Sequence, residues 1–176
     1  MKLNFKKALA LTLKHEGGWS DRLSDPGGAT MRGITLKTYS AWLERKATKE
    51  ELMNIKPEEI EEIYRLWYWE PVKGNVLSPG IDLAMFDFAV HSGPARAIMH
   101  LQALVGARMD SQIGPVTLAA IGGFESKWGV PEMVVRLIDS RSKFLRSSSL
   151  WLEYGRGFSK RLDSVKKEAL ALAQEA

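Results

Sequence analysis

A glutamate, an aspartate and a threonine follow one another in a glycine-rich stretch near the start of the chain. Glu16 stands at the end of a segment with helical spacing, and Asp25 and Thr30 follow within "KHEGGWSDRLSDPGGATMRGIT". Two carboxyl groups that flank a sugar linkage, one acting as acid and one as base, carry out glycoside hydrolysis. A threonine hydroxyl beside them could hold the attacking water. The three residues are therefore candidates for a hydrolytic site.

The apolar residues before Glu16 predict that its side chain faces the protein interior. Phe5, Leu9 and Leu13 have the spacing of an amphipathic helix, and the same stripe continues to Glu16. Burial disfavours the charged form of a carboxyl group. A carboxyl group that keeps its proton near neutral pH can act as a general acid. The alternative is that Glu16 is a helix-end residue whose side chain turns to solvent.

The segment after Glu16 is expected to turn back on itself. Asp25-Pro26-Gly27 strongly favours a turn, and the neighbouring glycines let the backbone approach other groups closely. Such a loop could bring Asp25 and Thr30 toward Glu16. The alternative for Asp25 is a turn residue whose side chain bonds its own backbone.

Most of the remaining chain has the patterns of helices, so a mainly α fold is expected, with a small irregular β-hairpin or loop near residues 18–35. Thr48 and Glu51 form a capping-box pattern, and Pro57 stands at a first helical position. The segment 80–93 is apolar nearly all round, which predicts a buried central helix. Helices are expected over residues 1–16, 34–45, 47–55, 56–72, 80–93, 94–106, 114–123, 131–149 and 161–175.

Composition narrows the class of protein further. The 176 residues include no cysteine, which excludes disulfides, thiolate metal sites and cysteine nucleophiles. No apolar run is long enough for a membrane span, and the N-terminal apolar run is too short for a signal peptide. The net charge of +4 suits a polyanionic partner such as nucleic acid, an anionic membrane or a bacterial cell wall. It equally suits a protein that needs charge only for solubility.

The stretch around Glu16 strongly resembles the signature of glycoside hydrolase family 108. Further blocks that resemble the family are "YRLWYWEPV", "FDFAVHSGPARAIMHLQ", "DSQIGPVT" and "GRGFSKR". The resemblance implies a lysozyme-like fold and an N-acetylmuramidase that cleaves the β-1,4 bond between N-acetylmuramic acid and N-acetylglucosamine without a cofactor. It makes Glu16 the general acid and gives Asp25 and Thr30 supporting roles, with Asp25 the weaker candidate.

Aromatic residues at helical spacing could form walls for sugar rings, although at least two of the four candidates are expected in the core. They are Trp19, Tyr64, Tyr68 and Trp69. His91 replaces the asparagine that is usual in the family, and is a further candidate for substrate contact or a polar group at a buried helix end. Asp87 is expected to be buried and hydrogen-bonded. No metal site is expected, because the histidines lack metal-ligand spacing.

The resemblance also implies an organisation and a partner. Residues 1–106 are expected to form a lysozyme-like core, and residues 107–176 a peptidoglycan-binding helical region packed on it as one compact unit. The expected partner is the peptidoglycan glycan strand, with neither nucleic acid nor an integral membrane segment. The protein would be made in the cytoplasm and reach the cell wall or periplasm through a holin or an export system, as in prophage endolysins. A lytic transglycosylase and a non-catalytic wall-binding or scaffold module remain the alternatives.

Overall fold

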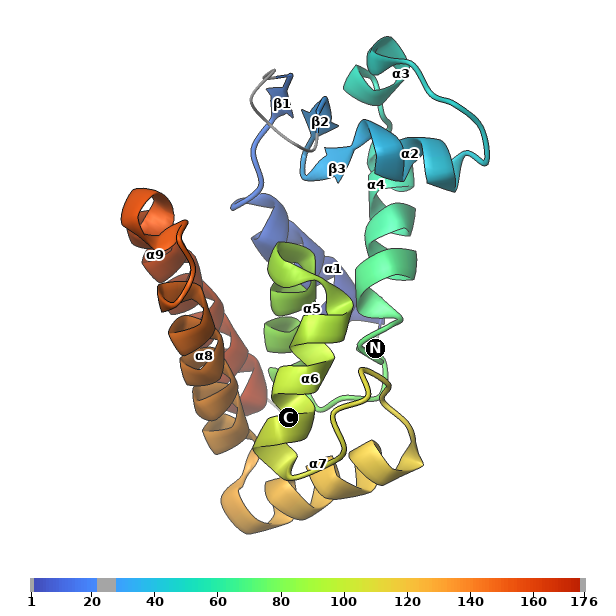
Figure 1. The fold of residues 1–176 in the computed structure, drawn as a ribbon. Coiled ribbons are helices and arrows are strands. Elements are labelled where there is room, and N and C mark those ends of the chain that lie inside the picture. Colours follow the sequence, from blue (N-terminus) through green and yellow to red (C-terminus); the bar gives the residue numbers. More distant parts are fainter. Residues whose placement is uncertain (1, 22–27, 175–176) are drawn as a thin grey trace.

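The structure, a computed structural model, describes residues 2–21 and 28–174. Helices account for most of these residues, and three short strands form an antiparallel sheet (Figure 1). This confirms the expected mainly α fold with a small β element near residues 18–35. The elements are α1 (Lys2–Leu13), β1 (Trp19–Ser20), β2 (Thr30–Met31), β3 (Ile34–Thr35), α2 (Leu36–Trp42), α3 (Lys49–Met53), α4 (Pro57–Tyr64), η1 (Arg65–Trp69), α5 (Ile81–Ser92), α6 (Pro94–Val105), α7 (Pro115–Trp128), α8 (Val130–Arg146) and α9 (Trp151–Gln174).

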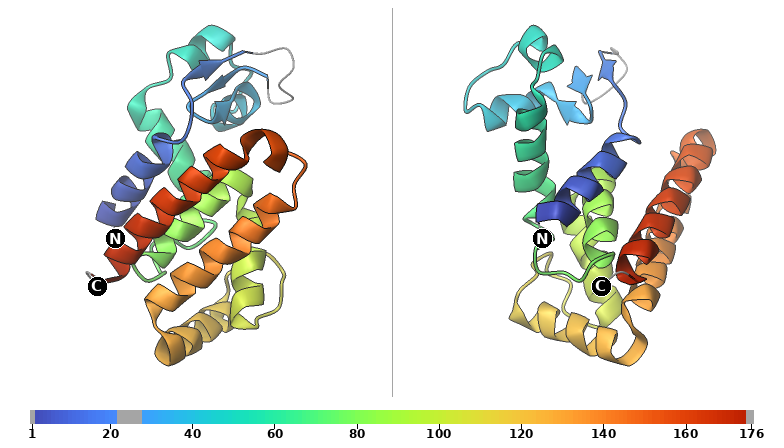
Figure 2. Two further views of the ribbon diagram at one scale, coloured as in Figure 1. Left: turned by 90° about the vertical axis from the view of Figure 1, so that its left-hand side faces the viewer. Right: turned by 180° about the vertical axis from the view of Figure 1, so that it is seen from behind.

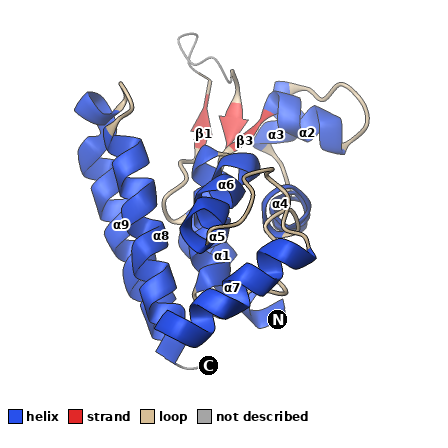
Figure 3. Ribbon diagram, turned by 60° about the horizontal axis from the view of Figure 1, so that its bottom comes forward, coloured by secondary structure: helices blue, strands red, loops and turns tan. Residues whose placement is uncertain are grey.

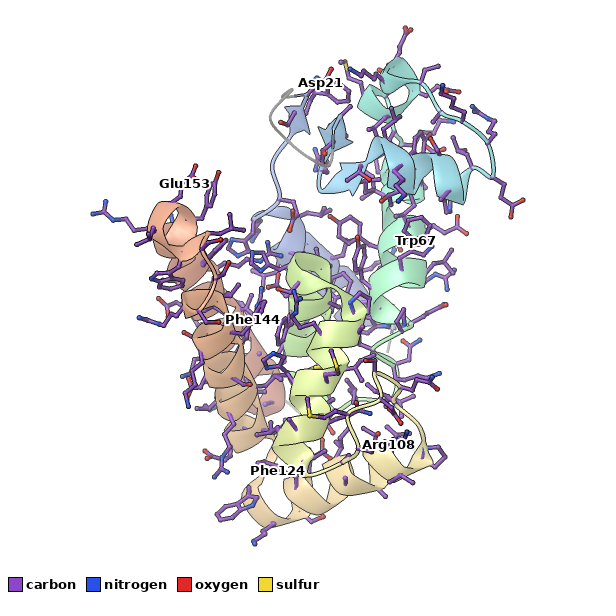
Figure 4. All side chains as sticks on the ribbon, viewed as in Figure 1. Asp21, Trp67, Arg108, Phe124, Phe144 and Glu153 are labelled. Atoms are coloured by element: carbon purple, nitrogen blue, oxygen red, sulfur yellow. The ribbon has the colours of Figure 1, made fainter. Side chains whose placement is uncertain are left out.

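Helix α5 is the centre of the fold, as its apolar sequence predicts. Nine successive residues of this helix, 81–89, are buried. Helices α1, α6, α8 and α9 all pack against it. Figure 3 shows α8 and α9 running side by side along one flank, with α7 crossing the end of the bundle. Phe144 extends from α8 toward α5 and α6 (Figure 4), where its ring lies 6.4 Å from that of Phe88.

The strands form a hairpin whose tight turn is set by backbone conformation. Strands β2 and β3 pair with Thr30 opposite Thr35, and β1 pairs along the other edge of β2. The two turn residues, Arg32 and Gly33, both have positive φ, as two-residue hairpins of type I′ require. The sheet sits with α2 and α3 at the end of the molecule opposite α7 (Figure 2).

Several predicted helix boundaries are confirmed by their capping contacts. Thr48 and Glu51 form the expected capping box at the start of α3, and Pro57 is the first residue of α4. The helix expected over residues 34–45 is shorter than predicted, because Ile34 and Thr35 belong to β3. Residues 65–69 form a π-helical turn that the sequence pattern does not distinguish from an α-helix.

Helix α9 begins at residue 151, ten residues before the predicted start at 161. The glycines of "GRGF" disfavour a helix by their intrinsic propensity, but packing overrides this preference. A Cβ atom on Gly155 would lie only 2.9 Å from the Trp151 ring, so glycine is what allows the indole to lie against the helix. Helix α7 likewise continues to Trp128 rather than ending at residue 123. The division into residues 1–106 and 107–176 stays a prediction, although α8 and α9 pack directly on α5.

Candidate active site

Glu16 lies just beyond the last residue of α1, where its backbone still follows the helical pattern. Its N–H donates to the carbonyl of Thr12 at 3.2 Å. Its side chain is only 18% exposed, consistent with the apolar stripe that leads to it. The hairpin turn covers the carboxylate from one side, because a Cβ atom on Gly33 would lie 2.9 Å from Glu16 Oε2. Glycine at this position therefore allows the turn to approach the carboxylate.

The other oxygen of Glu16 is held by an arginine from the far end of the chain. Arg161 Nη1 on α9 donates to Glu16 Oε1 at 2.7 Å, across 145 residues of sequence. The rest of the Arg161 guanidinium points to Asp87 of α5, which accepts from Nε and Nη2. Arg161 therefore links the candidate acid to the centre of the bundle.

Asp87 joins four helices in one buried polar cluster. Its fully buried carboxylate accepts hydrogen bonds from Thr12 on α1, from Arg141 on α8 at 2.7 Å and from Arg161 on α9. Burial alone would raise the pKa of Asp87, but the charges and hydrogen bonds of Arg141 and Arg161 outweigh it and hold the pKa far below its usual range. Asp87 is therefore ionised and structural, as expected from its place in the central helix.

Sequence reasoning did not assign Arg141 or Arg161 to the site. A signal was present, because each arginine interrupts an apolar helical stripe. On α8, Leu137, Ile138 and Leu145 are buried beside Arg141. An arginine on such a face needs a buried acidic partner, and the most apolar helix contains two buried acidic residues, Asp82 and Asp87. The partner of each arginine could have been sought there.

Two tyrosines, one from α4 and one from η1, lie close to Glu16. Tyr64 is 1% exposed, and its hydroxyl donates to the carbonyl of Arg32 at 2.7 Å. The ring of Tyr68 lies 5.4 Å from that of Tyr64. Burial raises the pKa of both hydroxyl groups, and the negative charge of Glu16 acts in the same direction. Both therefore remain neutral hydrogen-bonding groups close to Glu16.

A groove of about 670 Å³ opens beside Glu16, between the end of α1, the end of α5 and the first turns of α9. Glu153 marks the α9 end of this groove, at the tip of the α8–α9 pair (Figure 4). Its lining residues are Lys14, His15, Glu16, His91, Glu153, Tyr154, Gly157, Phe158, Lys160 and Arg161. Glu16 therefore forms part of the wall of an open groove.

The predicted sugar-contacting residues divide between the core and the neighbourhood of the site. Trp69 is 1% exposed and its indole N–H donates to Asn75, so the prediction that it stacks on sugar rings is wrong. Tyr64 is buried too and cannot stack, although its hydroxyl lies near Glu16. Two of the four aromatics are therefore core residues, as expected. Trp19 on β1 and Tyr68 are half-buried and keep some surface for a ligand.

The two supporting residues are less well defined than Glu16. Thr30 lies on β2, and its hydroxyl donates to the carbonyl of Gly28 at 3.2 Å. Its strand leads into the turn whose Gly33 lies beside Glu16. Asp25 lies outside the described residues. The roles of Thr30 and Asp25 stay predictions.

His91 lies at the C-terminal end of α5 and lines the groove, with its ring 5.0 Å from that of Phe158. Burial lowers the pKa of His91 to about 4, and the positive charges of Arg141 and Arg161 act in the same direction. The imidazole is thus neutral at neutral pH. This agrees with a polar group at a buried helix end, and it also leaves His91 in a position to contact a ligand.

His91 is expected to make the fold sensitive to mild acid. An unfolded histidine titrates near pH 6.5, so between that pH and about 4 the unfolded chain binds more protons. Stability should therefore fall as the pH is lowered through this window, by roughly 2–3 kcal/mol from this residue. Urea denaturation of the wild type and of His91→Asn at pH 7 and pH 4.5 measures it. A wild-type loss no larger than that of His91→Asn would contradict the assignment.

Two searches of the described residues bear on cofactors and membranes. No group of three or more acidic or histidine side chains in residues 2–21 and 28–174 is placed to hold a metal ion. Within the same residues, no helix is both long enough and apolar enough to cross a bilayer.

Comparisons with known proteins identify a family and a solved structure that are similar to this chain. A family model described as Glycosyl hydrolase 108 matches residues 9–93, which include Glu16, the hairpin and α5. The chain is also similar to the solved structure of Brucella abortus SagA, with 40% sequence identity and a TM-score of 0.88. The match covers 99% of this chain and 98% of that one. A comparison with curated proteins found no match. Arg161 and the α9 wall of the groove lie outside the segment that the family model matches.

Proposed function

Since the chain belongs to glycoside hydrolase family 108, we propose that it is a peptidoglycan hydrolase of the N-acetylmuramidase type. The observation that carries the proposal is the Glu16 carboxylate, held between the hairpin turn and Arg161 at the side of an open groove. In this reaction Glu16 protonates the oxygen of the β-1,4 bond, and a water attacks the anomeric carbon. Thr30 and Asp25 are proposed to position that water.

The contact with Arg161 fixes the position of the Glu16 carboxylate. Arg161 Nη1 donates to Glu16 Oε1 at 2.7 Å, while its Nε and Nη2 donate to the buried Asp87. We propose that Arg161 is a positioning residue that holds Glu16 at the side of the groove.

Replacing Gly33 with alanine is expected to lower activity by about tenfold or more, since an ångström-scale displacement of a reacting group carries a penalty of this order. The added methyl group would lie 2.6 Å from Tyr64 Oη and 2.9 Å from Glu16 Oε2, at a position with φ of +78°. Either the turn or the Glu16 carboxylate must shift. Gly28 also has positive φ but has open space around it, so Gly28→Ala provides a control for backbone strain. Equal activity losses in both variants would argue against the contact with Glu16.

The mass of the soluble products tests the reaction type. A muramidase releases fragments with a reducing N-acetylmuramic acid end, whereas a lytic transglycosylase releases an anhydro-sugar that is lighter by one water. Digestion of purified peptidoglycan, borohydride reduction and mass spectrometry distinguish these outcomes. Reduced muramic acid ends are expected. Anhydro ends would establish the transglycosylase, and binding without any soluble product would establish a wall-binding module.

The proposed substrate also implies where the enzyme acts. Peptidoglycan lies outside the cytoplasmic membrane, so we propose that the protein acts in the cell wall or periplasm after its release from the cytoplasm. A holin or an export system would provide that release.

A further inference from the structure

The groove beside Glu16 contains a glycine that the fold does not explain. Gly157 lies inside α9, where glycine is disfavoured relative to alanine. A Cβ atom at Gly157 would meet nothing within 4 Å, in contrast to Gly155, where it would meet the Trp151 ring. Packing therefore does not require glycine at position 157. Because Gly157 lines the groove, the missing side chain leaves room for a ligand on the α9 wall.

Two lysines stand in the same groove without an acidic partner among the described residues. Lys14 directly follows α1 and Lys160 belongs to α9, so they come from two different elements that line the groove. Both are exposed, and neither forms a salt bridge within residues 2–21 and 28–174. The third cation of the groove, Arg161, is already bound by Asp87 and Glu16. The free positive charge of the groove thus lies on the two lysines.

Aromatic surface lies beside these charges. Tyr154 and Phe158 are one helical turn apart on α9, with ring centroids 6.1 Å apart, and both line the groove. His91 completes this wall through its ring contact with Phe158. Aromatic faces suit the apolar faces of sugar rings, and ammonium groups suit carboxylates. The combination fits a glycan that carries acidic substituents.

We propose that this groove is a subsite for peptide-bearing glycan, in which Lys14 and Lys160 bind the carboxylates of the peptide stems over the open surface at Gly157. The inference rests on the proposed function, because peptidoglycan is a glycan whose peptides carry free carboxylates. It goes further in assigning recognition of the stem to α9, which the family model does not match. It predicts that the enzyme prefers peptide-bearing strands to neutral polymers of N-acetylglucosamine.

Calorimetric binding to two soluble probes tests the subsite, with every protein carrying Glu16→Gln so that no cleavage occurs. One probe is a peptidoglycan tetrasaccharide with its peptides, and the other is the same fragment with its carboxyl groups converted to amides. Combined Lys14→Ala and Lys160→Ala changes should weaken binding of the acidic probe by about three- to tenfold and leave the amidated probe unaffected. Lys167→Ala, on an exposed part of α9 outside the groove, is the matched control.

Gly157→Leu should weaken binding of both probes, since it fills the groove. Gly123→Leu is the control, because Gly123 is a helical glycine of α7 that also has open space around it. The subsite would be refuted if the lysine changes left affinity for the acidic probe intact, if they weakened both probes equally, or if Gly157→Leu bound both as tightly as its parent. Binding needs no cleavage, so an inactive wild type that keeps the expected pattern would refute the proposed function and uphold the subsite.

Discussion

Replacing Glu16 with glutamine is expected to lower the rate of peptidoglycan digestion by about 10²–10⁴-fold, the usual contribution of a general acid. Glutamine matches the shape of glutamate and can still accept a hydrogen bond from Arg161, but it has no proton of suitable acidity to give to a leaving oxygen. The hairpin turn and the Arg161 contact, both within hydrogen-bonding or van der Waals distance of this carboxylate, should persist. Release of soluble reducing ends from purified cell walls measures the effect.

Two controls distinguish the loss of the Glu16 carboxyl group from other effects of the substitution. Glu168→Gln removes an exposed carboxylate from α9 at a site away from the groove, and it should digest cell walls at the wild-type rate. Thermal unfolding of Glu16→Gln should remain cooperative, which shows that the loss of activity is not a loss of fold. Clearing of cell walls by Glu16→Gln at the wild-type rate would end the assignment of Glu16 as the acid.

Local patterns predicted the parts of this site that depend on neighbouring residues. The apolar stripe through Phe5 and Leu9 predicted that Glu16 faces the interior, and Phe5 and Leu9 are buried in the structure. The turn expected at Asp25-Pro26-Gly27 lies outside the described residues. Gly33 was expected to let the backbone approach other groups closely, and its positive φ and its position beside Glu16 agree with this. The apolar helix 80–93 was correctly expected to be central. Each of these features follows from periodicity or backbone preference within a few residues.

Features that depend on distant contacts were not predicted. Arg161 reaches Glu16 from 145 residues away, and helical spacing carries no information about which helix packs beside which. The early start of α9 was missed for the same reason, because the contact between Gly155 and Trp151 overrides the low helix propensity of glycine. The burial of Trp69 could not be predicted either, because the sequence pattern of an aromatic residue is the same whether its side chain faces a ligand or the core.

The charges around Glu16 explain why the C-terminal helices matter for the site. The cluster around Glu16 carries two positive and two negative charges when Glu16 is ionised. Its members are Asp87, Arg141, Arg161 and Glu16, and all except Glu16 are buried. Without α8 and α9, Asp87 would lose both cationic partners and Glu16 would lose its ion pair with Arg161. The segment that matches the family model therefore contains Glu16 and Asp87, whereas both arginines of the cluster come from residues after the match.

The largest loss of stability is expected from replacing Asp87 with alanine. This change leaves the buried guanidinium groups of Arg141 and Arg161 without their central partner, and breaking a buried ion pair from one side costs about 3–5 kcal/mol. Of the two arginines, Arg141 should lose more stabilising free energy when Asp87 is removed. Its Nε and Nη2 atoms already lack hydrogen-bond partners among the described residues, and its one hydrogen bond there is to Asp87. The midpoint of thermal unfolding should fall by about 10 °C or more.

A double variant separates the buried charge from the shape of the cluster. Arg141→Met combined with Asp87→Asn removes one charge of each sign while it keeps side chains of similar size, so it should be more stable than Asp87→Ala. Arg161 would then retain Glu16 as an anionic partner, as in the structure. Urea denaturation at pH 7 compares the three proteins. A free energy of unfolding of Asp87→Ala that differed from the wild-type value by only about 1 kcal/mol, as for an ordinary substitution, would contradict this prediction. In that case the cluster would not be what holds α1, α5, α8 and α9 together. The site would then owe its geometry to apolar packing alone.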